Sequence, residues 1–226
     1  MKLYIVATPL GNLGDITLRA LEILKSVPLI LCEDTRVSQK LLEHFQIKSR
    51  LISYHQHSGP AKVGQIISLL EEKGEAALIT DAGTPGISDP GNQLIARLIA
   101  SEVNDWEIIS IPGASALTAA LSISGLPTDK FLFLGFLPHK KGKETTLKRI
   151  AESEETVVFY ESTHRIIKTL EKLAEYLDKK RKVIVCRELT KKFETVYRGS
   201  INQVLEKLKA DVTKGEFVVV VGGKRF

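Results

Sequence analysis

The sequence predicts an α/β protein of two domains, with a mostly parallel sheet and flanking helices in the N-terminal half and a mixed sheet in the C-terminal half. In the first half, every short apolar run leads into a polar or glycine-rich loop and then into a helical pattern, which is the alternation of βαβ units. In the second half, two strand patterns are separated by only a short connection, which indicates an antiparallel pair. A chain of 226 residues is long enough for two modest domains.

The first half contains a series of predicted strands, each followed by a helix. The strands cover residues 3–8, 29–32, 51–54, 76–80 and 108–111. The helices cover residues 16–27, a segment that runs through residues 40–45, residues 63–72 and 92–100, and a segment that begins near Ser115. The first of these helices has one apolar face, formed by Leu18, Leu21, Leu24 and Val27. Because the carboxyl ends of parallel strands share one edge of a sheet, the loops that follow the strands are expected to form the functional edge.

The pattern changes after residue 116, so the domains are expected to cover residues 1–116 and 117–226. The second domain has predicted strands over 131–137, 156–160, 183–189, 194–198 and 217–221, and predicted helices over 144–153, 163–177 and 201–208. The strands over 183–189 and 194–198 form the expected antiparallel pair. The apolar segment 131–136 is expected in the core, and a contact in a homodimer is the alternative.

Composition is ordinary for a soluble globular protein, with 43% hydrophobic and 26% charged residues. No window approaches the run of about twenty apolar residues that a membrane span needs. The apolar N-terminus is short and runs directly into Pro9, so it is interpreted as a first strand rather than as a signal sequence. Cys32 and Cys186 lie in strand-like contexts without a partner motif, and both are expected to be reduced, buried thiols of a cytoplasmic protein.

The net charge of +5 is compatible with a polyanionic partner but does not identify one. The second half contains four clusters of basic residues, at 139–143, 148–149, 179–182 and 191–192. A single cluster of this kind is more often a solvated loop or helix end. Four clusters in one half of the chain favour a contact with an anionic surface.

The loop after the predicted strand over 76–80 has an extreme composition. Residues 79–91 include three glycines, two prolines and two aspartates. Glycine permits positive φ angles and close approach of a ligand, and proline stiffens a loop. A plain connection needs only one such residue, so this composition favours a binding loop over a simple turn.

Two further turns of small residues, at 9–15 and 112–116, are expected on the same edge of the sheet. Together the three turns can present backbone N–H and C=O groups to a polar cofactor that carries both charge signs. The first turn contains Gly11 and Gly14 but lacks the Gly-x-Gly-x-x-Gly dinucleotide fingerprint, and the chain has no Walker-type Gly-Lys-Ser/Thr. NAD and ATP are therefore disfavoured.

Candidate catalytic residues lie in two other loops. Glu33, Asp34 and Arg36 directly follow a strand, where an acid can accept a proton or position a hydroxyl. The alternative is a helix cap with a local ion pair, in which Asp34 or Thr35 caps the next helix. His55 and His57 are spaced to point to the same side of an extended segment, as groups for substrate contact or proton transfer.

A metal site is disfavoured, because it needs further ligands and the chain has only five histidines. We therefore expect no metal.

The assembled motifs resemble those of the tetrapyrrole methylase superfamily and, within it, of the small-subunit ribosomal RNA methyltransferase I family. The resemblance covers nearly the whole chain and is carried by residues 7–15, 32–36, 81–91, 112–116, 133–138, 161–165 and 187–192. It implies a two-domain methyltransferase that binds S-adenosylmethionine in a cleft between its domains. It also implies methylation of the ribose 2′-hydroxyl of a cytidine in the decoding region of 16S rRNA, and a homodimer.

The resemblance also implies roles for individual residues. Cofactor contacts fall on Leu10, Asp81, Gly83, Thr84, Ser115, Ala116, Tyr160 and Leu189. We expect in-line transfer of the methyl group, with the protein aligning the reacting atoms and taking up the hydroxyl proton. Candidates for the base or hydroxyl-positioning group are Glu33, Asp34, His55 and His57, with Arg36 as a phosphate or acid-orienting contact.

The chain departs from the family pattern at two places. Residues after His57 are Ser58 and Gly59 where Asn-Glu is expected, which puts a substrate-side acid in doubt, and Thr163 stands where proline is usual. Two alternative functions stay open: a tetrapyrrole (precorrin-type) C-methyltransferase, and a non-catalytic RNA-binding protein on the same fold. The basic clusters and the histidine loop favour RNA, within the small ribosomal subunit or as free rRNA.

Overall fold

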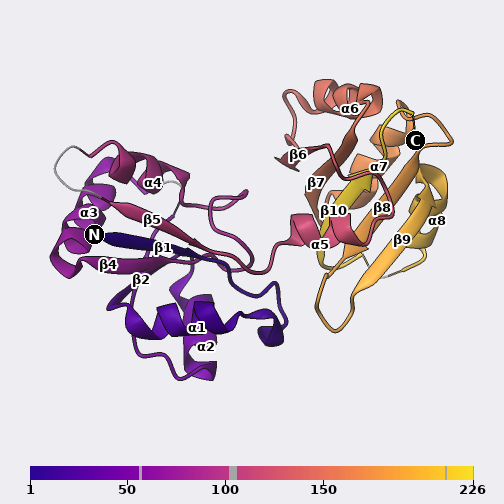
Figure 1. Ribbon diagram of the computed structural model, residues 1–226. Helices are drawn as coiled ribbons and strands as arrows, with labels where there is room; N and C mark the ends of the chain where they lie inside the picture. The colour runs from indigo at the N-terminus through magenta and orange to yellow at the C-terminus, as the bar shows by residue number, and fades with distance from the viewer. Residues whose placement is uncertain (56–57, 102–105, 212, 226) are drawn as a thin grey trace. The chain divides into compact units, whose positions relative to one another are not determined.

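The computed structural model describes residues 1–55, 58–101, 106–211 and 213–225. The chain divides into two compact units, Met1–Ser115 and Ala116–Phe226 (Figure 1). Each unit is built around a sheet of five strands, one parallel and one mixed, which confirms the predicted fold class. Among the described residues, no helix has the length and apolar character needed to cross a lipid bilayer.

Unit 1 contains a fully parallel sheet with the strand order β3-β2-β4-β1-β5. Its strands are β1 (Lys2–Val6), β2 (Leu29–Cys32), β3 (Arg50–Ser53), β4 (Glu75–Leu78) and β5 (Glu107–Ile111). Its helices are the short 3₁₀ helix η1 (Leu13–Asp15), α1 (Leu18–Ser26), α2 (Thr35–His44), α3 (Pro60–Lys73) and α4 (Asn92–Ile99).

Helices cover both faces of the unit 1 sheet, with α3 and α4 on one face and α1 and α2 on the other (Figure 1). Side chains along a strand alternate between faces. In β2, Leu29 and Leu31 therefore pack under α3 and α4, whereas Ile30 and Cys32 pack under α1 and α2. This double burial explains why the strands of unit 1 are short, continuous apolar runs.

Capping interactions define the first and last residues of the helices more precisely than the apolar pattern does. Helix α1 begins at Leu18, two residues later than predicted, because the Thr17 side chain accepts a hydrogen bond from Ala20 N (3.1 Å) and caps the helix. Helix α3 ends where Gly74 turns left-handed, with φ of 74°.

Unit 2 contains a mixed sheet with the order β6-β7-β10-β8-β9. Its strands are β6 (Phe131–Phe136), β7 (Thr156–Ser162), β8 (Lys182–Arg187), β9 (Thr195–Ser200) and β10 (Glu216–Val221). Its helices are α5 (Ala116–Ser122), α6 (Lys143–Glu152), α7 (Ile166–Ala174) and α8 (Ile201–Lys209). Only β6 and β7 are parallel, and the predicted antiparallel pair is confirmed as β8 and β9.

The two faces of the unit 2 sheet are covered unequally. Helices α6, α7 and α8 pack on one face, and α5 packs on the other (Figure 1). The central strand β10 is buried on both sides, with Val219 toward the three helices and Val218 toward α5. Cys32 and Cys186 are both free and buried, and burial raises the pKa of each thiol, that of Cys186 to about 11.

Candidate functional site

The three predicted loops of unit 1 are joined to one another at the carboxyl edge of its sheet. Thr8, after β1, and Gly83, after β4, exchange two backbone hydrogen bonds of 2.9 Å. The buried Thr8 hydroxyl donates to Thr80 O at 2.9 Å. Thr84 Oγ1 donates to Ala114 O in the loop after β5 at 3.2 Å. These contacts hold three segments far apart in sequence as one framework.

Glycine is required at the centre of this framework. Gly83 has a φ of +84°, which L side chains rarely adopt. A Cβ atom there would also lie 3.3 Å from Leu10 Cδ2 and 3.8 Å from Ala114 O. The structure therefore brings together Leu10, Gly83 and Thr84, three of the predicted cofactor residues, with Ala114, which directly precedes a fourth, Ser115.

The framework lies at a topological switch point of the sheet. Strands β1 and β4 are neighbours, yet the chain leaves β1 for α1 on one face and leaves β4 for α4 on the other. In open α/β sheets, ligands bind in the crevice that such a divergence opens beyond the strand ends. The topology of unit 1 and the composition of its loops therefore indicate the same ligand-binding loops.

Glu33 and Asp81 lie close together beside this crevice. Asp34 N donates to Asp81 Oδ1 at 3.1 Å, and Thr80 Oγ1 donates to Glu33 Oε2 at 3.4 Å. Burial and the nearby Asp81 raise the pKa of Glu33, and the Thr80 hydrogen bond offsets part of this shift. A carboxylate with a raised pKa is a better proton acceptor near neutral pH than an ordinary one.

Asp34 has a different environment, although it is adjacent to Glu33 in the chain. Its side chain caps α2 by accepting from Arg36 N at 2.8 Å and pairs with Arg36 NH2 at 2.6 Å. These hydrogen bonds lower the pKa of Asp34 to about 2. The structure thus shows the helix cap with a local ion pair, and the Arg36 side chain remains 87% exposed.

The histidine loop is described only in part. His55 is exposed, and its backbone N–H donates to Ser58 Oγ at 3.0 Å. His55 also lies near enough to Glu33 to lower its pKa slightly, against the larger effect of burial. His57 lies outside the described residues. No group of three or more metal-ligating side chains occurs in the described parts of the chain.

The three predicted cofactor residues of unit 2 share one side of its sheet. Ala116, Tyr160 and Leu189 all belong to the apolar cluster between the sheet and α5. Leu189 stands between two residues with positive φ, Glu188 at 52° and Thr190 at 67°. Strand β8 therefore ends at Arg187, two residues before the predicted end.

Thr190 is a candidate site residue that the sequence pattern did not indicate. Its Oγ1 atom is buried and has no hydrogen-bond partner among the described residues. A buried, unpaired hydroxyl is costly, and strained backbone of this kind gathers at ligand sites. The only sequence signal was its position beside Leu189 in a motif that ends a strand.

The segment 161–165 contains a buried ion pair between Glu161 and Arg165, whose side chains lie 3.2 Å apart. Arg165 occupies the cap position of α7, and no side chain makes a capping hydrogen bond there. Thr163, where proline is usual, donates through Oγ1 to Gly215 O at 2.5 Å and accepts from Gly215 N at 2.7 Å. Proline could form neither bond, so this departure ties the start of α7 to the start of β10.

Comparisons with known proteins agree with the motifs. A family model described as tetrapyrrole (corrin/porphyrin) methylases matches residues 2–205. A relative from Synechocystis sp. (strain ATCC 27184 / PCC 6803 / Kazusa), ribosomal RNA small subunit methyltransferase I, is 46% identical over 98% of this chain and 78% of its own. A relative of the same name from Escherichia coli O157:H7 is 43% identical over 99% of this chain and 78% of its own. Another, from Hydrogenobaculum sp. (strain Y04AAS1), is 46% identical over 98% of this chain and 95% of its own.

Solved structures agree in fold. A cobalt precorrin-4 methyltransferase matches with a TM-score of 0.70 and 18% identity, over 98% of this chain and 94% of that one. The native form of uroporphyrin III C-methyl transferase from Thermus thermophilus matches with a TM-score of 0.69 and 17% identity, over 98% and 97%. At this level of identity the similarity shows a shared fold and does not identify a substrate.

Proposed function

Since the chain belongs to the tetrapyrrole methylase family and, within it, to the ribosomal RNA small subunit methyltransferase I family, we propose that it methylates rRNA of the small ribosomal subunit with S-adenosylmethionine. More narrowly, the methyl group goes to the ribose 2′-hydroxyl of a cytidine in the decoding region of 16S rRNA. The observation that carries this proposal is 43–46% identity to relatives of that name over nearly the whole chain.

The residues present fit this cofactor. S-adenosylmethionine, when bound, supplies a methyl group on a positively charged sulfur, already activated for transfer to an oxygen. Asp81 offers an exposed carboxylate for its ammonium group, and the framework around Gly83 and Thr84 offers backbone groups for its polar ends. The glycine at position 83 leaves space that a Cβ atom would otherwise occupy.

Unit 2 offers groups of the complementary kind. Ala116, Tyr160 and Leu189 present apolar surface from one cluster, suited to the nonpolar parts of an adenosine. The unpaired Thr190 hydroxyl offers one hydrogen-bonding group beside them.

Glu33 is the best-suited group to take the hydroxyl proton. Its raised pKa favours proton uptake, whereas Asp34, with a pKa of about 2, is held by Arg36 and the start of α2. His55 remains exposed and near Glu33, where it can contact the substrate. Asp81 is assigned to the cofactor ammonium and not to the base. These roles belong to the proposal.

The proposed partners follow from the substrate. We propose that the enzyme works in the cytoplasm, as a homodimer, on 16S rRNA within the small subunit. The segment considered for a dimer contact is strand β6, which has exposed aromatic side chains at Phe131 (40%) and Phe136 (56%).

The test is methyl transfer from labelled S-adenosylmethionine to 30S subunits and to naked 16S rRNA, both taken from cells that lack this modification. A 2′-O-methyl group blocks alkaline cleavage of the adjoining phosphodiester bond, so hydrolysis maps the label to a ribose. Label on one cytidine ribose is the expected result. No label on either substrate, despite measurable cofactor binding, refutes the rRNA assignment, and transfer to a tetrapyrrole would then be measured.

A further inference from the structure

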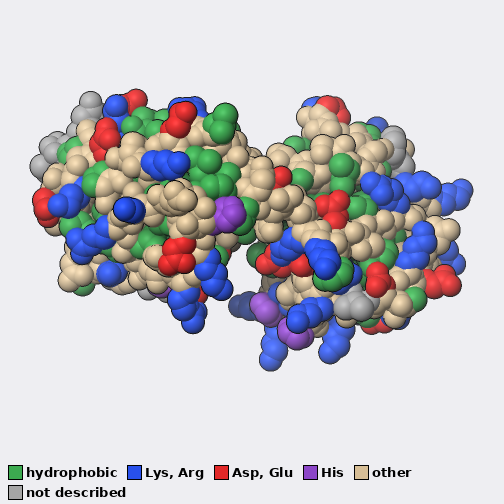
Figure 2. All heavy atoms as spheres, turned by 90° about the horizontal axis from the view of Figure 1, so that it is seen from below, with side chains coloured by type: hydrophobic (Ala, Val, Ile, Leu, Met, Phe, Trp, Pro, Cys, Tyr) green, Lys and Arg blue, Asp and Glu red, His purple; other side chains and the backbone are tan. Residues whose placement is uncertain are grey.

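The loop between β6 and α6 presents three basic side chains to solvent. His139, Lys140 and Lys141 are all exposed. The loop closes on itself through Lys143 N, which donates to Lys140 O at 3.2 Å, and through Gly142, whose φ is 85°. Figure 2 shows histidine side chains gathered with lysine and arginine side chains along one edge of unit 2.

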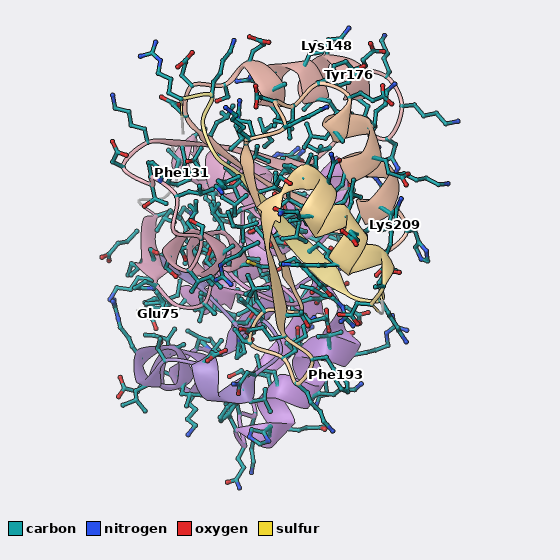
Figure 3. All side chains as sticks on the ribbon, turned by 90° about the vertical axis from the view of Figure 1, so that its right-hand side faces the viewer. Glu75, Phe131, Lys148, Tyr176, Phe193 and Lys209 are labelled. Carbon is teal, nitrogen blue, oxygen red and sulfur yellow. The ribbon has the colours of Figure 1, made fainter. Side chains whose placement is uncertain are left out.

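Lys140 and Lys141 lack the carboxylate partners that Lys148 and Lys191 have in two other basic clusters. Lys148 pairs with Glu144 at 2.9 Å and lies over the Tyr176 ring at 5.6 Å (Figure 3), and Lys191 pairs with both Glu188 and Glu216. Within the part of the chain that the structure describes, neither Lys140 nor Lys141 makes an ion pair. Their positive charge therefore remains available to an anion.

A buried ion pair holds the loop in place. Arg165 NH2 donates to Leu137 O at 2.6 Å and to Pro138 O at 3.3 Å, just before the exposed cations. Arg165 Nε in turn pairs at 3.2 Å with Glu161, whose side chain is fully buried. These contacts fix the end of β6 and the start of the loop against the residue that precedes α7.

Lys143 points inward and has a structural role, unlike the exposed Lys140 and Lys141. Its Nζ atom donates to Thr169 Oγ1 at 3.0 Å, and Thr169 Oγ1 donates to Glu161 at 2.8 Å. Burial lowers the pKa of Lys143. The basic cluster at 139–143 thus divides into one inward lysine, which fixes the loop, and an outward group, which is free to bind.

We propose that His139, Lys140 and Lys141 form a binding surface for RNA phosphates, held in shape by Arg165 and Glu161. A preorganised group of cations binds a phosphate backbone without reading its sequence, and it sets the register of the protein on the RNA. This inference rests on the proposed function, because it assigns rRNA as the polyanion.

The test compares two double variants of the full chain. Lys140→Ala/Lys141→Ala removes the outward lysines. Lys179→Ala/Lys180→Ala is the matched control, because it removes the same charge from two exposed lysines of the same unit. Binding to 30S subunits is measured over a range of salt concentrations, beside methyl transfer and the affinity for S-adenosylhomocysteine.

The first double variant is expected to bind 30S subunits roughly tenfold more weakly near physiological salt. Its slope of log K against log[salt] should be shallower by about 1.5, because each phosphate contact contributes about 0.7 to 0.9. The KM for 30S subunits should rise while kcat and the affinity for S-adenosylhomocysteine stay unchanged. The control should keep the wild-type slope.

The outcomes separate the two proposals. Wild-type binding and slope in Lys140→Ala/Lys141→Ala overturn the surface, even if the protein methylates 30S subunits as proposed. An equal loss in the control overturns it too, since net charge alone would then explain the effect. A wild-type protein that binds 30S subunits in a manner dependent on Lys140 and Lys141, yet transfers no methyl group, refutes the proposed function and supports the surface.

Discussion

Replacement of Glu33 by glutamine tests the assignment of the proton acceptor. The substitution keeps the shape of the side chain and an oxygen that can accept the Thr80 hydrogen bond, but it cannot take up a proton. General base catalysis contributes about 10²–10⁴-fold. Because a sulfonium methyl is already activated, the lower end applies, so Glu33→Gln should lower kcat about 100-fold, or ~2.7 kcal/mol of transition-state stabilisation.

The pH dependence gives a second readout. Wild-type activity should fall as the pH drops through the raised pKa of Glu33, and the variant should lose this acidic limb. The contribution of Glu33 to folding stability changes with pH in the opposite direction. A group whose pKa is raised in the folded state contributes stability below its unfolded pKa, about 4.3, and loses it as the pH rises through the folded value. The melting temperature of Glu33→Gln relative to wild type should therefore increase between pH 4 and pH 8.

Asp34→Asn is the matched control. Asparagine caps a helix as well as aspartate does, and an exposed ion pair such as that with Arg36 contributes little to stability. We expect kcat within about threefold of wild type. The assay is single-turnover methyl transfer to 30S subunits at saturating S-adenosylmethionine, with S-adenosylhomocysteine affinity measured beside it. Full activity in Glu33→Gln, or a loss in Asp34→Asn as large as in Glu33→Gln, would refute the reasoning.

Three further substitutions test the framework and unit 2. Gly83→Ala should cost about 1–2 kcal/mol in denaturant unfolding because of its positive φ, whereas Gly64→Ala, in α3 with open space around it, should be neutral or stabilising. Thr190→Val should leave stability unchanged or higher, because it removes an unpaired buried hydroxyl, while calorimetry should show S-adenosylhomocysteine bound about fivefold more weakly. Glu161→Ala should cost about 3–5 kcal/mol of unfolding free energy, whereas Glu144→Ala, which removes an exposed pair, should have little effect on stability.

Each of these expectations can fail separately. Equal stability of the two glycine variants would show that the conformation at Gly83 is not strained for alanine. A Thr190→Val variant with wild-type affinity would remove Thr190 from the cofactor site. A small cost for Glu161→Ala would mean that water or a rearranged Lys143 compensates Arg165, and that the loop it holds is not rigid.

Much of the architecture could be predicted from local patterns. Buried strands, amphipathic helices and glycine-rich turns have short-range signatures, and the parallel direction of the strands places the turns at 9–15, 79–91 and 112–116 on one edge. The antiparallel pair β8 and β9 followed from a short connection alone. Helix ends differed by a few residues, because caps such as Thr17 depend on individual hydrogen bonds that periodicity does not report.

The chemical character of the candidate residues required the tertiary structure. Glu33 and Asp34 are neighbours in the chain, and the sequence left them equivalent as bases. Their pKa values move in opposite directions, because Glu33 is half-buried near Thr80 and Asp81, 47 or 48 positions away, whereas Asp34 is bound by Arg36, two positions away.

The same holds for the basic cluster and for the missed hydroxyl. Lysines at 140, 141 and 143 look alike in sequence, and only packing of α6 against α7 turns Lys143 inward to Thr169. Thr190 is polar and adjacent to a charged segment, yet the fold buries its hydroxyl without a hydrogen-bond partner among the residues that the structure describes. The sequence by itself determined the order of strands and helices and the edge where the loops gather, because those depend on local periodicity and chain direction. The raised proton affinity of Glu33, the burial of the Thr190 hydroxyl and the pairing of Lys143 depend on how distant segments pack, so only the tertiary structure decided them.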